Sequence, residues 1–336
     1  MEKTAQRKDE HLQYALQFHN QQNPEWDSVS LPLRSLPELN LDEISLHTEI
    51  MGFSLDYPFY INAMTGGSRQ AEEWNRSLAI LARECGLMLV MGSYGIALRQ
   101  PEAKRSFAVI RREAPDICLG VNLGADKTPA EAWQAIEETA ADFLQIHINP
   151  LQELIMPEGE RNFRGWLGHI EEIVRKSPVP VMVKQVGFGM SRDDIMGLLA
   201  AGVRTIDISG RGGTNFAKIE NARRDRPFAE LENLGISTVE ALKNSWDFQG
   251  QAEFLASGGI KNALHIAKAL ALGAKAAGLA GQILYLLKEK GLTETIAEVE
   301  HWKEELKRLY LLCGVKNTAG LNRLAAGEKS ERKIRL

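Results

Sequence analysis

One stretch of the sequence places polar side chains at the spacing of a β-strand. Residues 144–149 read Leu-Gln-Ile-His-Ile-Asn, and successive side chains of a strand point to opposite faces. Gln145, His147 and Asn149 would therefore share one face, with apolar side chains on the other. Pro150 cannot donate to a sheet and should end the strand. The polar face offers groups that can exchange protons or bind a polar ligand.

Further polar side chains lie near the ends of predicted strands. Beyond Pro150, Gln152 and Glu153 are expected on a loop. A single loop carboxylate is usually solvated, but beside a phosphate it can hold Mg²⁺, which proteins bind through one or two carboxylates plus substrate phosphates. Asp207 lies between two isoleucines, so it should face the interior or the site, or bond to a loop for a structural reason.

Lys184 ends the apolar run of residues 179–183. A lysine at such a position can be a Schiff-base nucleophile, a general acid, or a cation beside an electron-rich ring. Its spacing from other residues leaves all three roles open.

The N-terminal stretch 4–22 has helical spacing of apolar residues. Arg7 and His11 are four residues apart and share a face, with Lys8 beside them. One interpretation is a solvated helix end. The other is an anion clamp folded over a site, because arginine and lysine both bind phosphate.

Eight short apolar runs alternate with amphipathic stretches, which indicates parallel strands joined by helices. Eight such units close a (β/α)₈ TIM barrel, and a doubly wound open sheet is the competing fold. We expect an N-terminal extension (1–57) that contributes to the substrate site, a barrel (58–313), and a C-terminal tail (314–336), with short strands near 49–55 closing one end of the barrel. The predicted strands are 59–63, 87–91, 117–121, 142–148, 179–184, 203–208, 252–257 and 274–279. The predicted helices are 71–85, 102–113, 129–139, 164–176, 191–200, 238–246, 260–272 and 294–313.

Local helix signals agree with this alternation. Thr128 and Ser191 are suited to cap helices that begin after them. Gly86, Gly202 and Gly273 each follow a predicted helix and precede a strand, as a left-handed helix end requires.

Glycines recur after the predicted strands. The active site of such a barrel is built from these loops, and the loops after strands seven and eight commonly bind phosphate. Gly258, Gly259, Ala280 and Gly281 lie in those two loops. Glycine lets backbone amides approach a ligand, and amides at a helix start favour anions. Taken alone, each of these two pairs of residues is explained equally well by a turn. Together, the two pairs favour a phosphate ligand.

The overall composition excludes some classes of protein. The formal net charge is -4, whereas a general nucleic-acid binder is usually strongly basic. No run approaches the ~18 apolar residues of a membrane span, and the N-terminus has no apolar signal core. We therefore expect a cytoplasmic protein without nucleic-acid or membrane partners.

The chain resembles type 2 isopentenyl-diphosphate isomerases, the flavin-dependent class. The resemblance runs from residue 7 to about 313 and rests on motifs that are spread along the chain. They are Arg7-Lys8 with His11, Met64–Gly67, Gln145–Asn149 with Gln152-Glu153, Lys184–Gly189, Gly212–Phe216, Ser257–Gly259 and Ala280-Gly281.

The resemblance implies an FMN cofactor, Mg²⁺, and NADPH as the reductant of the flavin without net redox change. It implies a 1,3-proton shift that interconverts isopentenyl and dimethylallyl diphosphates, in a homo-oligomer that is a tetramer or octamer. Catalytic roles fall to Gln152, His147 and Lys184, with Glu153 on the metal. Substrate contacts fall to Arg7, Lys8, His11, Asn149 and Gln152. Flavin contacts fall to Ala63, Met64, Thr65, Ser93, Asn122, Lys184, Ser209, Thr214, Gly258, Gly259, Ala280 and Gly281.

The chain departs from the family pattern at two places. Tyr94-Gly95 follows Ser93, where glutamine and then arginine are common. Lys261 stands where arginine is frequent. Contacts from the first of these loops to substrate or flavin are therefore open.

Two other functions compete with the isomerase. A flavin-dependent oxidase or dehydrogenase of 2-hydroxy acids would share the barrel, but its His-Gly-x-Arg segment has no counterpart in Ser209–Gly213, which lacks the histidine. A non-catalytic phosphate-binding barrel would not need Lys184, Gln152 and Glu153 together.

Overall fold

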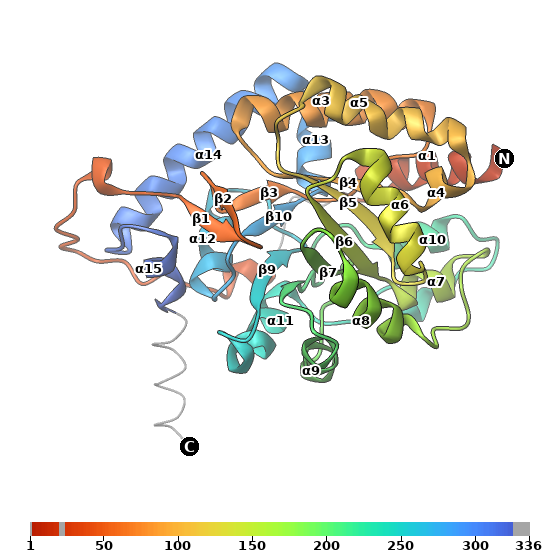
Figure 1. The fold of residues 1–336 in the computed structure, drawn as a ribbon. Helices are drawn as coiled ribbons and strands as arrows, with labels where there is room; N and C mark the ends of the chain where they lie inside the picture. Colours follow the sequence, from red (N-terminus) through yellow and green to blue (C-terminus); the bar gives the residue numbers. More distant parts are fainter. Residues whose placement is uncertain (1, 20–23, 325–336) are drawn as a thin grey trace.

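Eight parallel strands close into a barrel at the centre of the molecule (Figure 1). The computed structural model describes residues 2–19 and 24–324. Around the barrel each strand pairs with the next in chain order, and the last strand pairs with the first. The TIM barrel is confirmed, and a doubly wound open sheet is excluded. The strands are β3 (Phe59–Ile61), β4 (Leu89–Ser93), β5 (Leu119–Gly124), β6 (Phe143–Ile148), β7 (Val181–Gln185), β8 (Thr205–Asp207), β9 (Glu253–Ser257) and β10 (Ala277–Leu279).

Helices surround the barrel, and all eight predicted ones are present with small shifts at their ends. They are α3 (Arg69–Cys85), α5 (Arg105–Glu113), α6 (Pro129–Thr139), α8 (Trp166–Lys176), α9 (Arg192–Ala200), α11 (Thr238–Ser245), α12 (Ala263–Ala271) and α14 (Leu292–Leu312).

The local helix signals work as predicted. Thr128 forms a capping box with Glu131 at the start of α6, and Ser191 does the same with Asp194 at the start of α9. Gly86, Gly202 and Gly273 all have positive φ angles, of 61°, 86° and 101°. At these three positions the chain leaves a helix in a left-handed conformation, which glycine adopts without steric cost.

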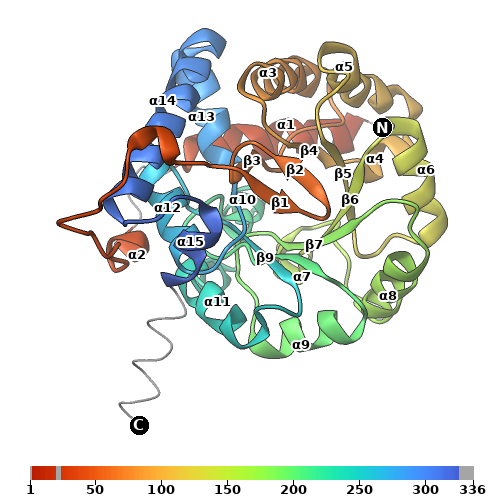
Figure 2. The same cartoon turned by 60° about the vertical axis from the view of Figure 1, so that its left-hand side comes forward.

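A small antiparallel hairpin closes one end of the barrel, which we call the lower end. Its strands are β1 (Thr48–Ile50) and β2 (Phe53–Leu55). Ile50 and Leu55 are buried in a cluster that includes Phe143 from inside the barrel. Figure 2 shows the hairpin in front of the ring of strands. The predicted closure by residues 49–55 is confirmed.

The opposite end of the barrel, which we call the mouth, carries short helices that the sequence analysis did not predict. They are α4 (Gly95–Arg99), α7 (Pro150–Ile155), α10 (Phe216–Ala222) and α13 (Gly281–Lys290). The expectation that Gln152 and Glu153 lie on a loop is wrong, because both lie in α7. Proline ends a strand and also suits the first position of a helix, and Pro150 does both.

The two ends of the chain pack on the barrel at different places. The N-terminal helix α1 (Glu2–Gln17) crosses the mouth, with Leu12 and Ala15 buried, and packs against α3, α10 and α13. The short helix α2 (Pro24–Asp27) follows. Part of the predicted C-terminal tail is a packed helix, α15 (Thr318–Asn322), which buries Leu321 completely. The remaining tail residues, 325–336, lie outside the described residues.

Candidate active site

Two adjoining hollows open at the mouth of the barrel, with empty volumes of about 630 and 1290 Å³. Five residues line both hollows, among them Met64 from the loop after β3 and Lys184 from β7. A ligand that extends from one hollow into the other therefore passes Lys184.

The smaller hollow, which we call the glycine pocket, has seven glycines in its lining. A Cβ atom on Gly258, whose φ is 97°, would lie 2.0 Å from the carbonyl oxygen of Gly210. One on Gly213 would lie 2.8 Å from the amide nitrogen of Gly259. The loops after β8 and β9 thus approach so closely that only glycine fits. With the start of α13 at Gly281, the amides of these loops are suited to bind an anion.

Most residues assigned to the flavin by resemblance meet at the two pockets. The glycine pocket is lined by Ala63, Met64, Lys184, Ser209, Thr214, Gly258, Gly259, Ala280 and Gly281, and the larger hollow by Ser93 and Asn122. Thr65 lines neither of them. Its hydroxyl bonds to Asn75 on α3, so its side chain points away from the mouth.

Lys184 lies at the junction of the pockets. Its ammonium group donates to the backbone carbonyl of Gln185 (2.6 Å) and to the hydroxyl of Ser209 (3.1 Å). Burial lowers the pKa of Lys184, and the charge of Asp207 opposes that shift. Since an ammonium has three N–H groups, one is left for a ligand.

A chain of side-chain hydrogen bonds crosses the barrel interior from Asp207 to His147. Asn62 Nδ2 donates to Asp207 Oδ2 (2.8 Å), and Asn62 Oδ1 accepts from Gln145 Nε2 (3.1 Å). Gln145 Oε1 accepts from Asn122 Nδ2 (2.8 Å), and Asn122 Oδ1 is 2.8 Å from His147 Nδ1. A carboxylate only accepts, so each amide has one satisfying orientation. The chain therefore holds the proton of His147 on Nδ1.

His147 is neutral near pH 7. Burial, followed by the charges of Lys8, Lys184 and Lys127, lowers the pKa of His147 to about 4, against the opposing charge of Asp126. Because Nδ1 already donates, Nε2 is the atom that gains or loses a proton.

Asp207 faces the interior, as the sequence predicted. Besides Asn62, it accepts hydrogen bonds from the hydroxyl of Tyr60 (2.9 Å), the hydroxyl of Ser257 (2.7 Å) and the backbone amide of Ser209 (3.1 Å). Its role in the fold is thus to fix side chains beneath the mouth.

The larger hollow, which we call the charged pocket, gathers the residues assigned to the substrate and the metal. They are Arg7, Lys8, His11, His147, Asn149, Gln152 and Glu153, joined by the cations Arg99 and Lys127. Burial, and then the charges of Arg7 and Arg99, lower the pKa of Lys8 to about 8. The interpretation of this segment as a solvated helix end is therefore wrong.

The start of α7 presents three functional groups with their positions fixed. Asn149 Nδ2 donates to Gln152 Oε1 (3.2 Å) and Glu153 Oε1 (2.9 Å). Glu153 Oε2 accepts from the backbone amide of Glu160 (2.8 Å). Gln152 Nε2 donates to Glu220 Oε1 (3.1 Å). Both ends of the Gln152 amide are thereby held.

Glu220 on α10 is a site residue that the sequence analysis missed. Its carboxylate is fully buried and lies 2.8 Å from His11 Nε2 and 2.5 Å from Arg223 Nη1. Burial alone would raise the pKa of Glu220, but hydrogen bonds from His11 and Gln152 and the charge of Arg223 lower it to about 2. The carboxylate is therefore ionised across the physiological range.

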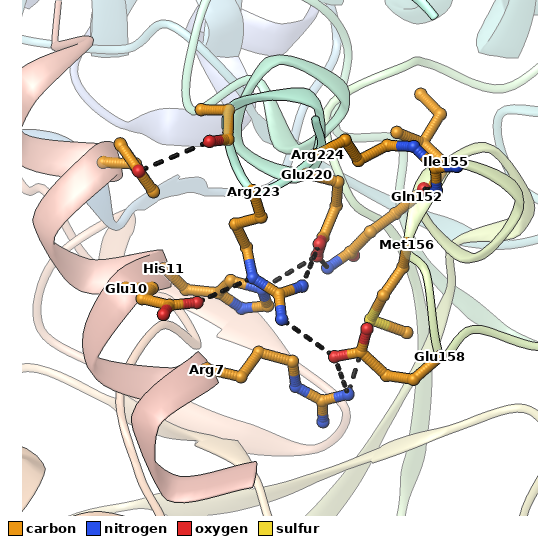
Figure 3. A network of polar contacts seen from close by, with 12 residues as sticks. Arg7, Glu10, His11, Gln152, Ile155, Met156, Glu158, Glu220, Arg223 and Arg224 are labelled. Atoms are coloured by element: carbon orange, nitrogen blue, oxygen red, sulfur yellow. Dashed lines mark hydrogen bonds and ion pairs between the residues drawn. The ribbon is translucent and has the colours of Figure 1, made fainter. Parts of the chain in front are cut away.

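Arg223 joins α1, α10 and the segment after α7 (Figure 3). Its guanidinium bonds to Glu10 (2.8 Å), Glu158 (3.0 Å) and Glu220 (2.5 Å). Arg7 Nη1 also contacts Glu158, at 3.3 Å. This network holds the cationic face of α1 against the charged pocket.

Comparison with known proteins identifies the family. The model of FMN-dependent dehydrogenases matches residues 116–326. An isopentenyl-diphosphate delta-isomerase of Listeria monocytogenes serotype 4a is 46% identical over 321 residues, which cover 94% of this chain and 89% of the relative. One of Listeria innocua serovar 6a is 44% identical over 318 residues, with the same two coverages. The chain belongs to the isopentenyl-diphosphate delta-isomerase family.

Solved structures share the barrel of this isomerase family at low identity. A flavocytochrome b2 mutant matches with a TM-score of 0.67 and 17% identity, over 94% of this chain and 82% of that one. A mandelate oxidase mutant with (S)-mandelic acid matches with a TM-score of 0.63 and 16% identity, over 94% and 89%. These likenesses show the fold.

The family departure at Tyr94-Gly95 has a structural explanation in this isomerase-family member. Tyr94 is buried, donates to Glu138 Oε2 (2.8 Å) and packs edge-on against Phe107. It points away from the mouth. A Cβ atom on Gly95 would lie 3.3 Å from Lys127 Cε. Lys127 thus fills the space beside Gly95 and brings a cation, paired with Asp126, to the charged pocket.

Three further findings concern the other sequence-based expectations. Lys261 lines the glycine pocket, and burial lowers its pKa. Among residues 2–19 and 24–324, no three His, Cys, Asp or Glu side chains group as a metal site. Over the same residues, no helix has the length and apolar character to cross a membrane.

Proposed function

We propose that this protein interconverts isopentenyl and dimethylallyl diphosphates by a 1,3-proton shift in isoprenoid precursor biosynthesis, with FMN in the glycine pocket and the diphosphate and Mg²⁺ in the charged pocket. The observation that carries the proposal is the junction of an anion site made of backbone amides with a second site made of cations. This pairing suits a phosphorylated cofactor beside a diphosphate substrate. The 44–46% identity to named isomerases supports it.

The glycine pocket fits the phosphate of FMN. Its close-approaching glycines leave backbone amides and the start of α13 facing the hollow, which is chemistry that binds phosphate. Lys184 would lie beside the flavin ring, and Ser93 and Asn122 would meet the ring from the charged pocket. When bound and reduced, the flavin supplies an electron-rich surface and a proton donor, and NADPH would be its reductant.

The charged pocket fits a magnesium diphosphate. Glu153 would contribute one carboxylate, and the substrate phosphates would complete the coordination of Mg²⁺. Arg7, Lys8, Arg99 and Lys127 would neutralise the remaining negative charge of the diphosphate.

The protein's own groups would hold the hydrocarbon part and manage protons. His147 presents Nε2 as an acceptor, because Nδ1 is held by Asn122. Gln152 is a candidate participant in removal of the C2 proton. Its amide is a poor base by itself, so its fixed orientation between Asn149 and Glu220 is its main contribution.

Oxidation of a 2-hydroxy acid is the second function considered. Its support is the shared fold, at 15–17% identity, and the family model of FMN-dependent dehydrogenases. The histidine expected in Ser209–Gly213 is missing. The isomerase proposal also includes a homo-oligomer, a tetramer or octamer, that works in the cytoplasm, and family resemblance is its support.

The test is incubation of the purified protein with isopentenyl diphosphate, Mg²⁺, FMN and NADPH in D₂O. We expect dimethylallyl diphosphate that carries deuterium, and no sustained consumption of NADPH. Absence of both product and deuterium would refute the isomerase function. Reduction of the flavin by a 2-hydroxy acid such as mandelate would favour the second function instead.

A further inference from the structure

Helix α1 brings side chains to both pockets. Arg7, Lys8 and His11 line the charged pocket, and His19, just beyond the end of α1, lines the glycine pocket. The helix packs against α10 near the first pocket and against α13 near the second. One element of the chain thus meets the places proposed for two different anions.

His19 is held in place by α13. Its Nε2 atom is 3.0 Å from Gln282 Oε1, and its ring stacks on Tyr285 with centroids 4.5 Å apart and an interplanar angle of 24°. Its Nδ1 atom is 3.9 Å from the point where a Cβ on Gly281 would stand, and the hydroxyl of Thr214 is 2.9 Å from that same point. The imidazole therefore faces the backbone at the start of α13.

The charges around His19 favour an anion. Lys261 comes from the loop after β9 and lines the same pocket, and Tyr285 is the titratable group that α13 presents to the ring. Burial, and then the charge of Lys261, lower the pKa of His19, and the hydrogen bond with Gln282 opposes this. A phosphate dianion would counter both effects, because an imidazolium donates through both nitrogens.

We propose that His19 binds the phosphate end of the flavin, and that α1 thereby couples the flavin site to the substrate diphosphate site. The inference rests on the proposed placement of FMN in the glycine pocket. Each anion would contact side chains carried by α1 or directly after it, so the position of α1 that favours one anion would also favour the other.

The first experiment compares FMN with riboflavin, which lacks the phosphate. Quenching of flavin fluorescence on titration with protein gives the two dissociation constants. We expect His19→Ala to weaken FMN binding about tenfold, as for the loss of one charge-assisted hydrogen bond, and to leave riboflavin binding unchanged. The matched control is His301→Ala, which removes an exposed histidine on α14. Unchanged FMN binding, or equal losses for both flavins, would overturn the assignment.

The second experiment measures coupling. The dissociation constant of magnesium pyrophosphate is determined by calorimetry for protein saturated with FMN and for protein saturated with riboflavin. We expect the wild type to bind pyrophosphate at least about fivefold more tightly with FMN, within the usual range of coupling, and His19→Ala to show no difference. Equal affinities in the wild type, or the same ratio in both proteins, would refute the coupling.

These measurements separate the inference from the proposed function. A wild type that binds FMN but does not isomerise isopentenyl diphosphate contradicts the function and leaves the His19 comparison valid. An active wild type whose flavin binding is indifferent to His19→Ala contradicts the inference alone. Thermal unfolding of each variant confirms that the fold is intact.

Discussion

The two pockets at the mouth are built from different materials. The glycine pocket is made of backbone from loops that follow consecutive barrel strands, and its shape is set by the approach of Gly213 and Gly258 to their neighbours. The charged pocket is made of side chains from α1, α4, α7 and α10, whose charges are balanced by internal ion pairs. The first is a cradle whose backbone groups do not titrate. The second is an adjustable site whose charge is set by ionisable side chains.

The largest effect is expected from Gly258→Ala, which changes the glycine pocket. Its φ of 97° is strained for alanine, and the new Cβ would lie 2.0 Å from the carbonyl oxygen of Gly210. Strain of about 1–3 kcal/mol, plus displacement of backbone, should weaken FMN binding at least about 100-fold, measured by fluorescence quenching. Gly197→Ala in α9 is the control, because nothing lies within 4 Å of its added methyl group. Wild-type FMN affinity in Gly258→Ala would show that the cradle is not the flavin site.

The adjustable site is probed next by Glu153→Gln. Removal of the carboxylate should lower turnover on the order of 10–100-fold, and added Mg²⁺ should restore part of it, because a neutral amide still offers one oxygen. Initial rates over a series of Mg²⁺ concentrations test this. Exposed Glu171 provides a matched Glu→Gln control. A Mg²⁺ dependence identical to that of the wild type would remove Glu153 from the metal site.

The pH dependence of stability should distinguish the two pockets further. The pKa of His147 is about 4 in the folded chain and about 6.5 when unfolded, so the unfolded state binds the proton first. Stability is thus lost as pH falls from 6.5 to 4, and His147→Gln should reduce that loss by about 2–3 kcal/mol. Denaturant unfolding at pH 7, 5.5 and 4 measures it, with His301→Ala as the control. An unaltered pH profile would contradict the neutral state of His147.

The smallest effect is expected at Lys127 in the charged pocket. Lys127 fills the space beside Gly95 and is already paired with Asp126. Lys127→Ala should raise the KM for isopentenyl diphosphate about three- to fivefold with kcat unchanged, because its pairing with Asp126 already offsets much of its charge. Lys176→Ala on α8 is the control, since that lysine pairs with Glu172 within its own helix. A change in kcat alone would mean that Lys127 does not act through substrate binding.

The difference between the two pockets also explains which parts of the site could be predicted from the sequence. The glycine pocket was predictable because glycines after strands are a local signal, and the barrel places such loops together. For the charged pocket, residue chemistry left two interpretations open, a solvated helix end or an anion clamp, and the family motifs favoured the clamp. Glu220 was missed because its partner His11 lies more than 200 positions away in the sequence. The helix that holds Glu153 was missed because Pro150 signals a strand end and a helix start alike.

Side-chain direction was the other limit of sequence reasoning. Tyr94 followed a serine expected at the flavin, but its ring turned outward to Glu138. Thr65 likewise turned its hydroxyl to Asn75. In both cases the direction of the side chain was decided by partners on neighbouring helices.

The β1–β2 hairpin has a consequence for access to the site. It stops one end of the barrel with Ile50 and Leu55, so both pockets open at the other end, the mouth crossed by α1. On the proposed function, cofactor and substrate would therefore enter and leave by the same route, and the position of α1 would govern the exchange of both.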